Sequence, residues 1–516
     1  MVGWNSLPNE LRLIILNDLF ASEVPSFHRT RTFRRRYHQS SYAAVSRQLQ
    51  WYFERKNFEC LQIRQADLQD FGRIMTEERR LALRTLWLCV EFTPYTCDKC
   101  HSEETNEEAA ANNVTFTHAL WNLFTTLSEW TATDGTDTKC PRLTLALSAY
   151  SPSDKDHHFR DHRFDDNCSM FFWDDPTVHH DPAHGWYSGT QVLPSQASRL
   201  RLLGKPLHFD FAQMETDTRN LPEIRFVHTL RIPRQFYRQI PELDIILKSL
   251  PRLQTFQYEP WKEVTSERDW ECVKGLGKLL AALPTSLKRL SVYQGLSESI
   301  NQEIKYDSSV LTAFWLSSPR LSLWELNASF ITETEDFFRP FDTRYRPKES
   351  VYSDPRCVAS WRELRVLTMT TRLLGPRRHG QGQELDRFLR AAAAAVLRMP
   401  KLNILELWYG RRQEGRIFRY TRTPAEILIE WRDMDNTPAS LSSHVIKAWQ
   451  NIAKCKRRPF RLEYDTIQRR QIRSRGSMLL ELKTSYAVVS ELSRAQLLWE
   501  SRNLRVVRRI PPHGIL

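Results

Sequence analysis

The sequence predicts a mixed α+β / α/β protein, in which a short helical domain precedes a stack of alternating helices and strands. Three observations support this prediction: helical spacing of apolar residues at the N-terminus, a recurring strand-like phrase further on, and a globular composition. With 516 residues, of which 41% are hydrophobic, the chain exceeds one ordinary core. We expect a helical domain at 1–60, an αβ region at 61–426 and a basic capping segment at 427–516.

The N-terminal stretch WNSLPNELRLIILNDLF, residues 4–20, is typical of a helix with two apolar stripes. Ser6 suits the N-cap position and Pro8 the first turn. On a helical wheel the first stripe comprises Leu7, Leu11, Ile14 and Ile15, and the second comprises Leu13, Leu16 and Phe20. One stripe packs on the helix's own domain, so a second stripe requires a second cover, which another protein can supply.

A second amphipathic helix is predicted in SYAAVSRQLQWYFER, where apolar side chains recur at spacings of three and four. The apolar positions are Tyr42, Val45, Leu49 and Phe53. The intervening segment 21–41 contains the basic run RTRTFRRR at 29–36.

These two helices resemble an F-box. The Leu7-Pro8-x-Glu10-Leu11 opening, the Ile14-Ile15-Leu16 run and the later Val45-Ser46-Arg47 with Trp51 match the family pattern in order, although segment 21–41 is longer than the family's usual linker. The resemblance implies docking on a Skp-family adaptor, and through it on a cullin–RING ubiquitin ligase. The contact residues that it carries over are Leu7, Pro8, Leu11, Ile14, Ile15, Val45 and Trp51. The alternative is an ordinary N-terminal helix buried in one large domain.

After Phe58 a short phrase recurs: Pro or a basic residue, then Leu, then alternating apolar residues. The clearest copies are CPRLTLALSAYS, LPRLQTFQYE, LPTSLKRLSVYQ, SPRLSLWELNAS, WRELRVLTMTT and MPKLNILELWYG. Five leucines that we take as equivalent, separated by 34, 34, 43 and 38 residues, are Leu253, Leu287, Leu321, Leu364 and Leu402. Helical stretches are expected at Pro241–Leu250, Val273–Leu283 and Leu385–Met399.

One helix and one strand per repeat predict a stack of αβ units, and the region resembles an irregular leucine-rich-repeat solenoid. An ordinary α/β domain is the alternative. In the C-terminal segment we expect strands at ILIEWR and SMLLELKT, and helices at HVIKAWQNIAKC and AVVSELSRAQLLWESRN.

Most of the chain is similar to the F-box-like proteins of filamentous fungi. F-box proteins often join their N-terminal helices to a repeat region that selects the target of ubiquitylation. The resemblance therefore implies a non-catalytic adaptor, the substrate-recognition subunit of a Skp–cullin–F-box ubiquitin ligase that binds a protein target.

The string Cys97-Asp-Lys-Cys100-His101 has the spacing of half a zinc site. The histidines of segment 151–189 are candidates for the missing ligands. Six of them lie in Asp154–His184 with eight aspartates and Cys168, namely His157, His158, His162, His179, His180 and His184. A metal-dependent, zinc-type protein is thus the alternative function; the other interpretation is a polar loop with reduced cysteines.

Other classes of function are not expected. The net charge of +13 comes mainly from residues 451–516, where 15 basic and 5 acidic residues give 15 − 5 = +10. These charges alternate with apolar segments, so we expect a solvated face and no nucleic-acid arm. No apolar run reaches the roughly 18 residues of a membrane span, and no Walker loop or nucleophile elbow occurs. We expect no enzyme activity, no membrane contact and a cytoplasmic or nuclear location.

Overall fold

The computed structural model describes most of the chain. The described residues are 4–23, 41–132, 142–160, 180–214, 219–296, 322–331, 333–341, 361–375, 381–411, 414–434, 440–469, 472, 474–485, 488–500 and 505–507. Among these residues no helix is long and apolar enough to cross a membrane. The basic run 29–36, His162, Cys168 and His179 lie outside the described residues.

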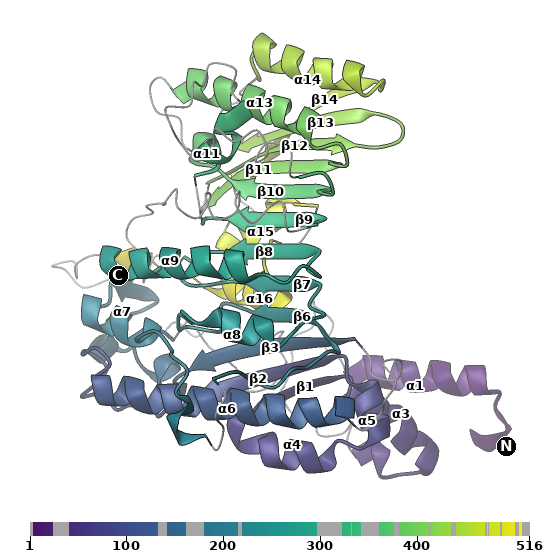
Figure 1. Ribbon diagram of the computed structural model, residues 1–516, viewed down its shortest axis with the longest axis vertical. Coiled ribbons are helices and arrows are strands. Elements are labelled where there is room, and N and C mark those ends of the chain that lie inside the picture. Colours follow the sequence, from purple (N-terminus) through teal and green to yellow (C-terminus); the bar gives the residue numbers. More distant parts are fainter. Residues whose placement is uncertain are drawn as a thin grey trace.

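An open twelve-stranded sheet dominates the fold, and its strands lie side by side in chain order (Figure 1). All neighbours are parallel except β12, which runs antiparallel to β11 and β13. The strands are β1 Cys60–Arg64, β2 Thr85–Glu91, β3 Leu143–Tyr150, β6 Val227–Ile232, β7 Thr255–Tyr258, β8 Arg289–Tyr293, β9 Glu325–Ser329, β10 Val366–Thr370, β11 Ile404–Arg411, β12 Glu414–Arg422, β13 Ile427–Met434 and β14 Phe460–Ile467. The mixed α+β class is therefore confirmed, and β13 and β14 of the predicted capping segment extend the same sheet.

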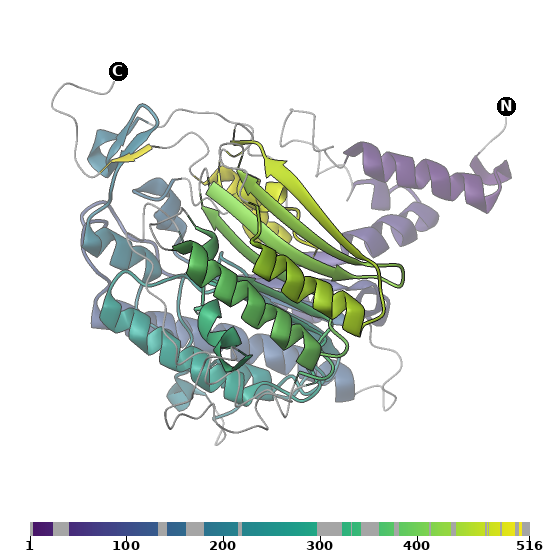
Figure 2. The ribbon, with the colours of Figure 1, turned by 90° about the horizontal axis from the view of Figure 1, so that it is seen from above.

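Helices that connect consecutive strands cover one face of this sheet (Figure 2). They are α4 Leu68–Ile74, α6 Asn106–Ala132, α8 Leu243–Lys248, α9 Ser266–Ala282, α11 Thr334–Phe338, α13 Gln381–Arg398 and α14 Ser443–Cys455. The short helices α5 Glu77–Ala82 and α7 Gln196–Leu203 complete the connections on the β1–β6 side. Leu86 and Leu88 of β2 face the main core, whereas Trp87 and Cys89, which alternate with them along the strand, face the opposite side. The alternation of side chains along a strand thus requires a cover on both faces.

The repeated leucine precedes each strand by two residues and is buried. Leu253, Leu287, Leu364 and Leu402 hold this position before β7, β8, β10 and β11. Before β9 the position belongs to Leu323, which is also buried. The choice of Leu321 as the equivalent leucine was therefore wrong by two residues. SPRLSLWEL contains two leucines, at 321 and 323, whose side chains would point to the same side of a strand. Leu321 itself lies outside the described residues.

The C-terminal segment returns to cover the second face, beside β6–β12. It forms α15 Arg475–Leu482 and α16 Glu491–Trp499, whose Leu482 and Leu497 join a core with Trp408 of the sheet. The expected strand at SMLLELKT is wrong, because Ser474 caps a helix there by accepting a hydrogen bond from the Ser477 amide. The sequence correctly predicted that the segments of α8, α9, α13, α14 and α16 are helical.

Polar groups at the ends of the strands hold α16 in place. The Ser490 amide, at the α16 N-cap, donates to Glu259 Oε1 at 2.5 Å, directly after β7. Arg234, fully buried after β6, donates to Glu500 Oε2 at 2.9 Å. Because both pairs are buried, loss of one partner would leave an uncompensated polar group, which is strongly destabilising.

A small sheet and short 3-10 helices complete the described structure. The sheet consists of β4 Trp186–Tyr187, β5 Thr190–Val192 and β15 Arg505–Val507. The 3-10 helices are η1 Trp4–Ser6, η3 Gln65–Asp67, η4 Pro152–Asp156, η5 Pro182–His184, η6 Phe211–Gln213, η7 Arg339–Phe341 and η9 Arg372–Leu374.

The contact between α15 and α16 requires a glycine at 476. A Cβ at this position would lie 2.3 Å from the backbone nitrogen of Leu498, so Gly476→Ala must push the two helices apart. We expect it to lower the free energy of unfolding by about 1–3 kcal/mol. Gly275→Ala in α9 is the matched control, since no atom lies within 4 Å there, and helix propensity should raise stability by up to about 1 kcal/mol. Urea unfolding followed by tryptophan fluorescence measures both; equal effects would contradict the packing described.

Candidate functional site

The two N-terminal helices form a separate small core that projects beyond the β1 end of the sheet (Figure 1). They are α1 Asn9–Glu23 and α3 Arg47–Asn57. Leu16 of α1 packs against Tyr52 and Phe53 of α3, and all three are buried. The Tyr52 hydroxyl donates to Asn17 Oδ1 at 2.5 Å. For the described residues, the alternative of an N-terminal helix buried in one large domain is therefore wrong.

The second predicted helix is interrupted. Residues 41–43 are helical, a turn follows, and Ser46 then caps α3 by accepting a hydrogen bond from the Leu49 amide. The serine side chain competes for backbone donors and favours a new helix start over a continuous helix. As a result Val45 lies on the turn, outside the stripe that Leu49 and Phe53 form.

Most of the residues that the resemblance assigns to adaptor contact are exposed, and we refer to these residues together as the apolar N-terminal surface. Leu7 is half-buried and Pro8 is exposed. The others are between 43% and 69% exposed, namely Leu11, Ile14, Ile15, Val45 and Trp51. Within the first stripe of α1, Leu11, Ile14 and Ile15 are thus exposed among the described residues, whereas Leu7 is half-buried.

The second stripe of α1 is only partly buried. Leu16 is buried and Leu19 packs at the edge of the same core. Leu13, however, is 45% exposed, so the chain covers the second stripe only in part. The side chain of Phe20 lies outside the described residues.

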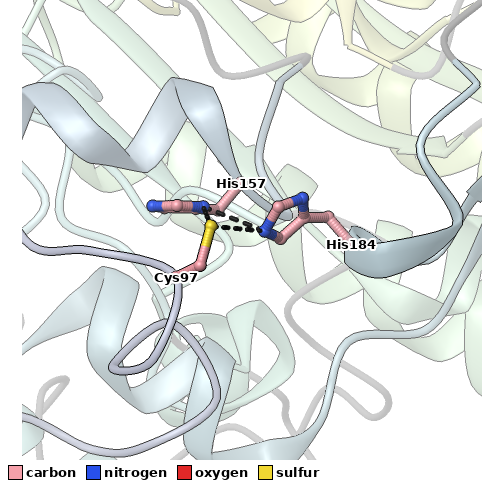
Figure 3. Close-up of side chains that lie close together, drawn as sticks. All are labelled: Cys97, His157 and His184. Atoms are coloured by element: carbon pink, nitrogen blue, oxygen red, sulfur yellow. Dashed lines mark hydrogen bonds between the residues drawn. The ribbon is translucent and has the colours of Figure 1, made fainter.

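A second site lies on the far side of the sheet, where loops cover β2 and β3. Cys97, in the loop after β2, approaches His157, at the end of η4, and His184, at the end of η5 (Figure 3). Its Sγ lies 3.6 Å from His157 Nδ1 and 3.6 Å from His184 Nε2, and these two nitrogens are 3.0 Å apart. Both histidines are buried, whereas Cys97 is exposed.

The remaining nitrogens of these two histidines have partners of their own. His184 Nδ1 lies 2.7 Å from Asp181 Oδ2, which also accepts from Arg160. His157 Nε2 lies 3.5 Å from the carbonyl oxygen of Tyr95, whose ring stacks on the imidazole. Each ring is thereby fixed with its other nitrogen directed at Cys97.

Cys100, His101 and His158 form a neighbouring triplet, with donor atoms within 4.8 Å of one another. We call the two triplets together the Cys/His cluster. His158 Nδ1 lies 3.0 Å from the carbonyl oxygen of His184, and its Nε2 is buried without a hydrogen-bond partner. The structure thus brings the CDKCH string close to histidines of segment 151–189, the candidates for the missing ligands, but divides Cys97 and Cys100 between two triplets.

Burial controls the protonation of the cluster. Desolvation lowers the pKa of His157, and it lowers the pKa of His158 to about 4. Both imidazoles are therefore neutral at pH 7, which is the form that binds metal ions. Desolvation also raises the pKa of the buried Cys100 thiol.

The sequence pattern did not identify every participant. His180 contacts Ser188 and is in neither triplet. Tyr95 and Asp181 were missed, although the Asp-x-x-His spacing of Asp181 and His184 is a local signal for a carboxylate that orients an imidazole.

Comparison with known families gives one match. A family model described as a family of unknown function (DUF6546) matches residues 282–490. The matched part runs from β8 to the start of α16 and contains neither the apolar N-terminal surface nor the Cys/His cluster. The searches of curated proteins and of solved structures found no match.

The small N-terminal core depends on Leu16. We expect Leu16→Ala to destabilise the α1–α3 pair by about 2–5 kcal/mol, because the substitution removes a buried side chain from the contact with Tyr52 and Phe53. Ile14→Ala, on the exposed stripe of the same helix, should cost less than about 0.5 kcal/mol. Hydrogen exchange of the α1 and α3 amides measures both effects. Faster exchange in Ile14→Ala than in Leu16→Ala would contradict this assignment of the two stripes.

Proposed function

We propose that the protein is a non-catalytic F-box adaptor, the substrate-recognition subunit of a Skp–cullin–F-box ubiquitin ligase. The observation that carries the proposal is the apolar N-terminal surface. A helix pair that buries Leu16, Tyr52 and Phe53 while exposing Leu11, Ile14, Ile15 and Trp51 has satisfied its own core and retains a second apolar face. Leu11, Ile14 and Ile15 lie on one side of α1, and groups of exposed apolar side chains are typical of protein-interaction sites.

The occupant we propose for this surface is a Skp-family adaptor. The support comes from the correspondence between the exposed residues and those that the F-box resemblance assigns to adaptor contact. Trp51 and the isoleucines can supply the buried apolar anchors that dominate binding energy at such interfaces. Through the adaptor the chain would join a cullin complex, and we place its action in the cytoplasm or nucleus.

We further propose that the αβ region is an irregular leucine-rich-repeat solenoid that holds the protein target. The parallel strands follow chain order, and a buried leucine stands two residues before β7–β11. Quasi-repetitive αβ stacks of this kind provide extended surfaces for macromolecular partners.

The sheet faces themselves are not the surfaces on which a target would bind. Connecting helices cover one face, and α15, α16 and the loops around Cys97 and His184 cover much of the other. The target surface we propose therefore consists of these covering segments, whose outer sides face solvent. Among them Leu480 of α15 is 46% exposed.

No bond chemistry in this chain is required by the proposal. An adaptor raises the effective concentration of its target near a charged ubiquitin-conjugating enzyme and orients the acceptor lysine. Ubiquitin transfer would then be performed by the recruited partners.

The proposal predicts that charge on the first α1 stripe abolishes adaptor binding. We expect Leu11→Asp and Ile15→Asp each to weaken binding to a purified Skp-family adaptor at least about tenfold, because each buries a carboxylate in an apolar interface. Leu13→Asp is a matched control, since Leu13 is 45% exposed against 47% for Leu11 and lies on the other stripe. Isothermal titration calorimetry with the full chain measures all three.

Two outcomes would contradict the adaptor role. One is a parent protein that fails to bind the adaptor. The other is a Leu13→Asp variant that loses binding as completely as Leu11→Asp. That result would indicate that α1 unfolds or that the adaptor does not contact one specific face of α1. Circular dichroism of each variant separates loss of fold from loss of contact.

A further inference from the structure

Three segments that are distant in sequence converge at Cys97, His157 and His184. Cys97 is 60 residues from His157 and 87 residues from His184. Cys97 lies in the connection between β2 and β3, whereas both histidines lie in the connection between β3 and β6. Neither the core of the sheet nor the apolar N-terminal surface requires a thiol and two imidazoles at one point.

The distances among these three atoms are those of ligands around one tetrahedral ion. Zinc bonds of about 2.3 Å to sulfur and 2.0–2.1 Å to nitrogen imply S···N separations of about 3.6 Å and an N···N separation of about 3.4 Å. Both S···N distances are 3.6 Å, and the N···N distance of 3.0 Å is slightly shorter.

The nitrogens of the two histidines have the contacts that ligating imidazoles make. The outer nitrogens face acceptors, Asp181 Oδ2 for His184 and the Tyr95 carbonyl for His157. With a proton on each outer nitrogen, the inner nitrogens present lone pairs toward Cys97 Sγ. A cation would accept electron pairs from all three atoms, whereas the single proton of the Cys97 thiol can serve one nitrogen only.

The surroundings have the form of an outer shell around a metal. A carboxylate that holds the distal N–H of a ligating imidazole fixes its tautomer and raises its basicity, and Asp181 does this for His184. The neighbouring triplet adds a buried imidazole nitrogen, His158 Nε2, that has no hydrogen-bond partner, whereas His158 Nδ1 contacts the carbonyl oxygen of His184.

We propose that Cys97, His157 and His184 bind a Zn²⁺ ion. One thiolate and two neutral imidazoles are ligands that zinc takes readily, whereas Mg²⁺ and Ca²⁺ require oxygen ligands. The ion ties together the loop after β2, the end of η4 and η5, which cover the second face of the sheet beside β2 and β3. The role of the ion is to hold these covering segments in place, and the site is independent of the apolar N-terminal surface.

Elemental analysis of the full chain, reconstituted with zinc and freed of excess metal, tests the site. We expect one zinc ion per chain in the parent and close to none in Cys97→Ser. Cys455→Ser is the matched control, because Cys455 is also an exposed free cysteine, and it should retain the ion. Asp181→Asn should retain zinc but bind it about 10–100-fold more weakly in competition with a chromogenic chelator, as expected for a positioning residue.

Cobalt substitution provides a second measurement if Cys97→Ser does not fold. Co²⁺ in the parent chain should show the thiolate-to-cobalt charge-transfer band and the intense visible bands of tetrahedral coordination. Two ions per chain, one lost in Cys97→Ser and the other in Cys100→Ser, would support the site and assign the second triplet as well. A parent that binds no zinc, a parent that takes iron or copper in its place, or a Cys97→Ser variant with full zinc content would overturn the proposal.

Discussion

A parallel sheet must be covered on both faces, and this constraint shapes the whole molecule. The helices between strands cover one face as a direct result of parallel order, because each crossover must return along the sheet. The second face receives no crossover helices between β6 and β11 among the described residues, although the strands present Tyr293 and Trp408 there. The chain meets this requirement with its last helices, α15 and α16. Beside β2 and β3 it does so with α7 and with loops.

The two covers of the second face are held by different means. α16 is anchored by buried polar pairs, in which Glu259 accepts the N-terminal amide of the helix and Arg234 pairs with Glu500. A carboxylate at a helix N-terminus also interacts favourably with the helix dipole. The loops beside β2 contain only short helices and strands, with few backbone hydrogen bonds between strands. Side-chain contacts must therefore order these loops. The Cys/His cluster lies among these contacts.

Sequence reasoning succeeded where local periodicity decides structure. The strand phrase before β7, β8, β10 and β11 and the amphipathic helices α13 and α14 follow from spacing alone, since the buried side chains recur at two or at three to four residues. SMLLELKT misled us because a continuous apolar run fits a buried strand and a buried helix equally well. There the Ser474 cap, four residues before Met478, the first apolar residue of the run, was the decisive and overlooked signal.

The candidate sites differ in how far the sequence could predict them. The apolar N-terminal surface lies on two neighbouring helices and the residues directly before them, so its residues could be named individually. For the Cys/His cluster, spacing indicated Cys97 and Cys100 as one half, but it wrongly suggested that they share a single set of ligands. Their division between His157 with His184 and His101 with His158 depends on how loops 60 to 87 residues apart cross over the sheet. No local pattern contains that information.

The junction between α3 and the sheet connects the two halves of the proposed function. α3 ends at Asn57 and β1 begins at Cys60, so the helix pair joins the αβ region through a very short connection. Arg79 of α5 reinforces it by pairing with Glu54 of α3 at 3.1 Å and by lying over the Phe58 ring. An adaptor bound to the apolar N-terminal surface would therefore hold the αβ stack in a defined orientation. Orientation is what a substrate-recognition subunit must supply, because transfer requires the target lysine to face the conjugating enzyme. A long flexible linker at this point would provide proximity without direction.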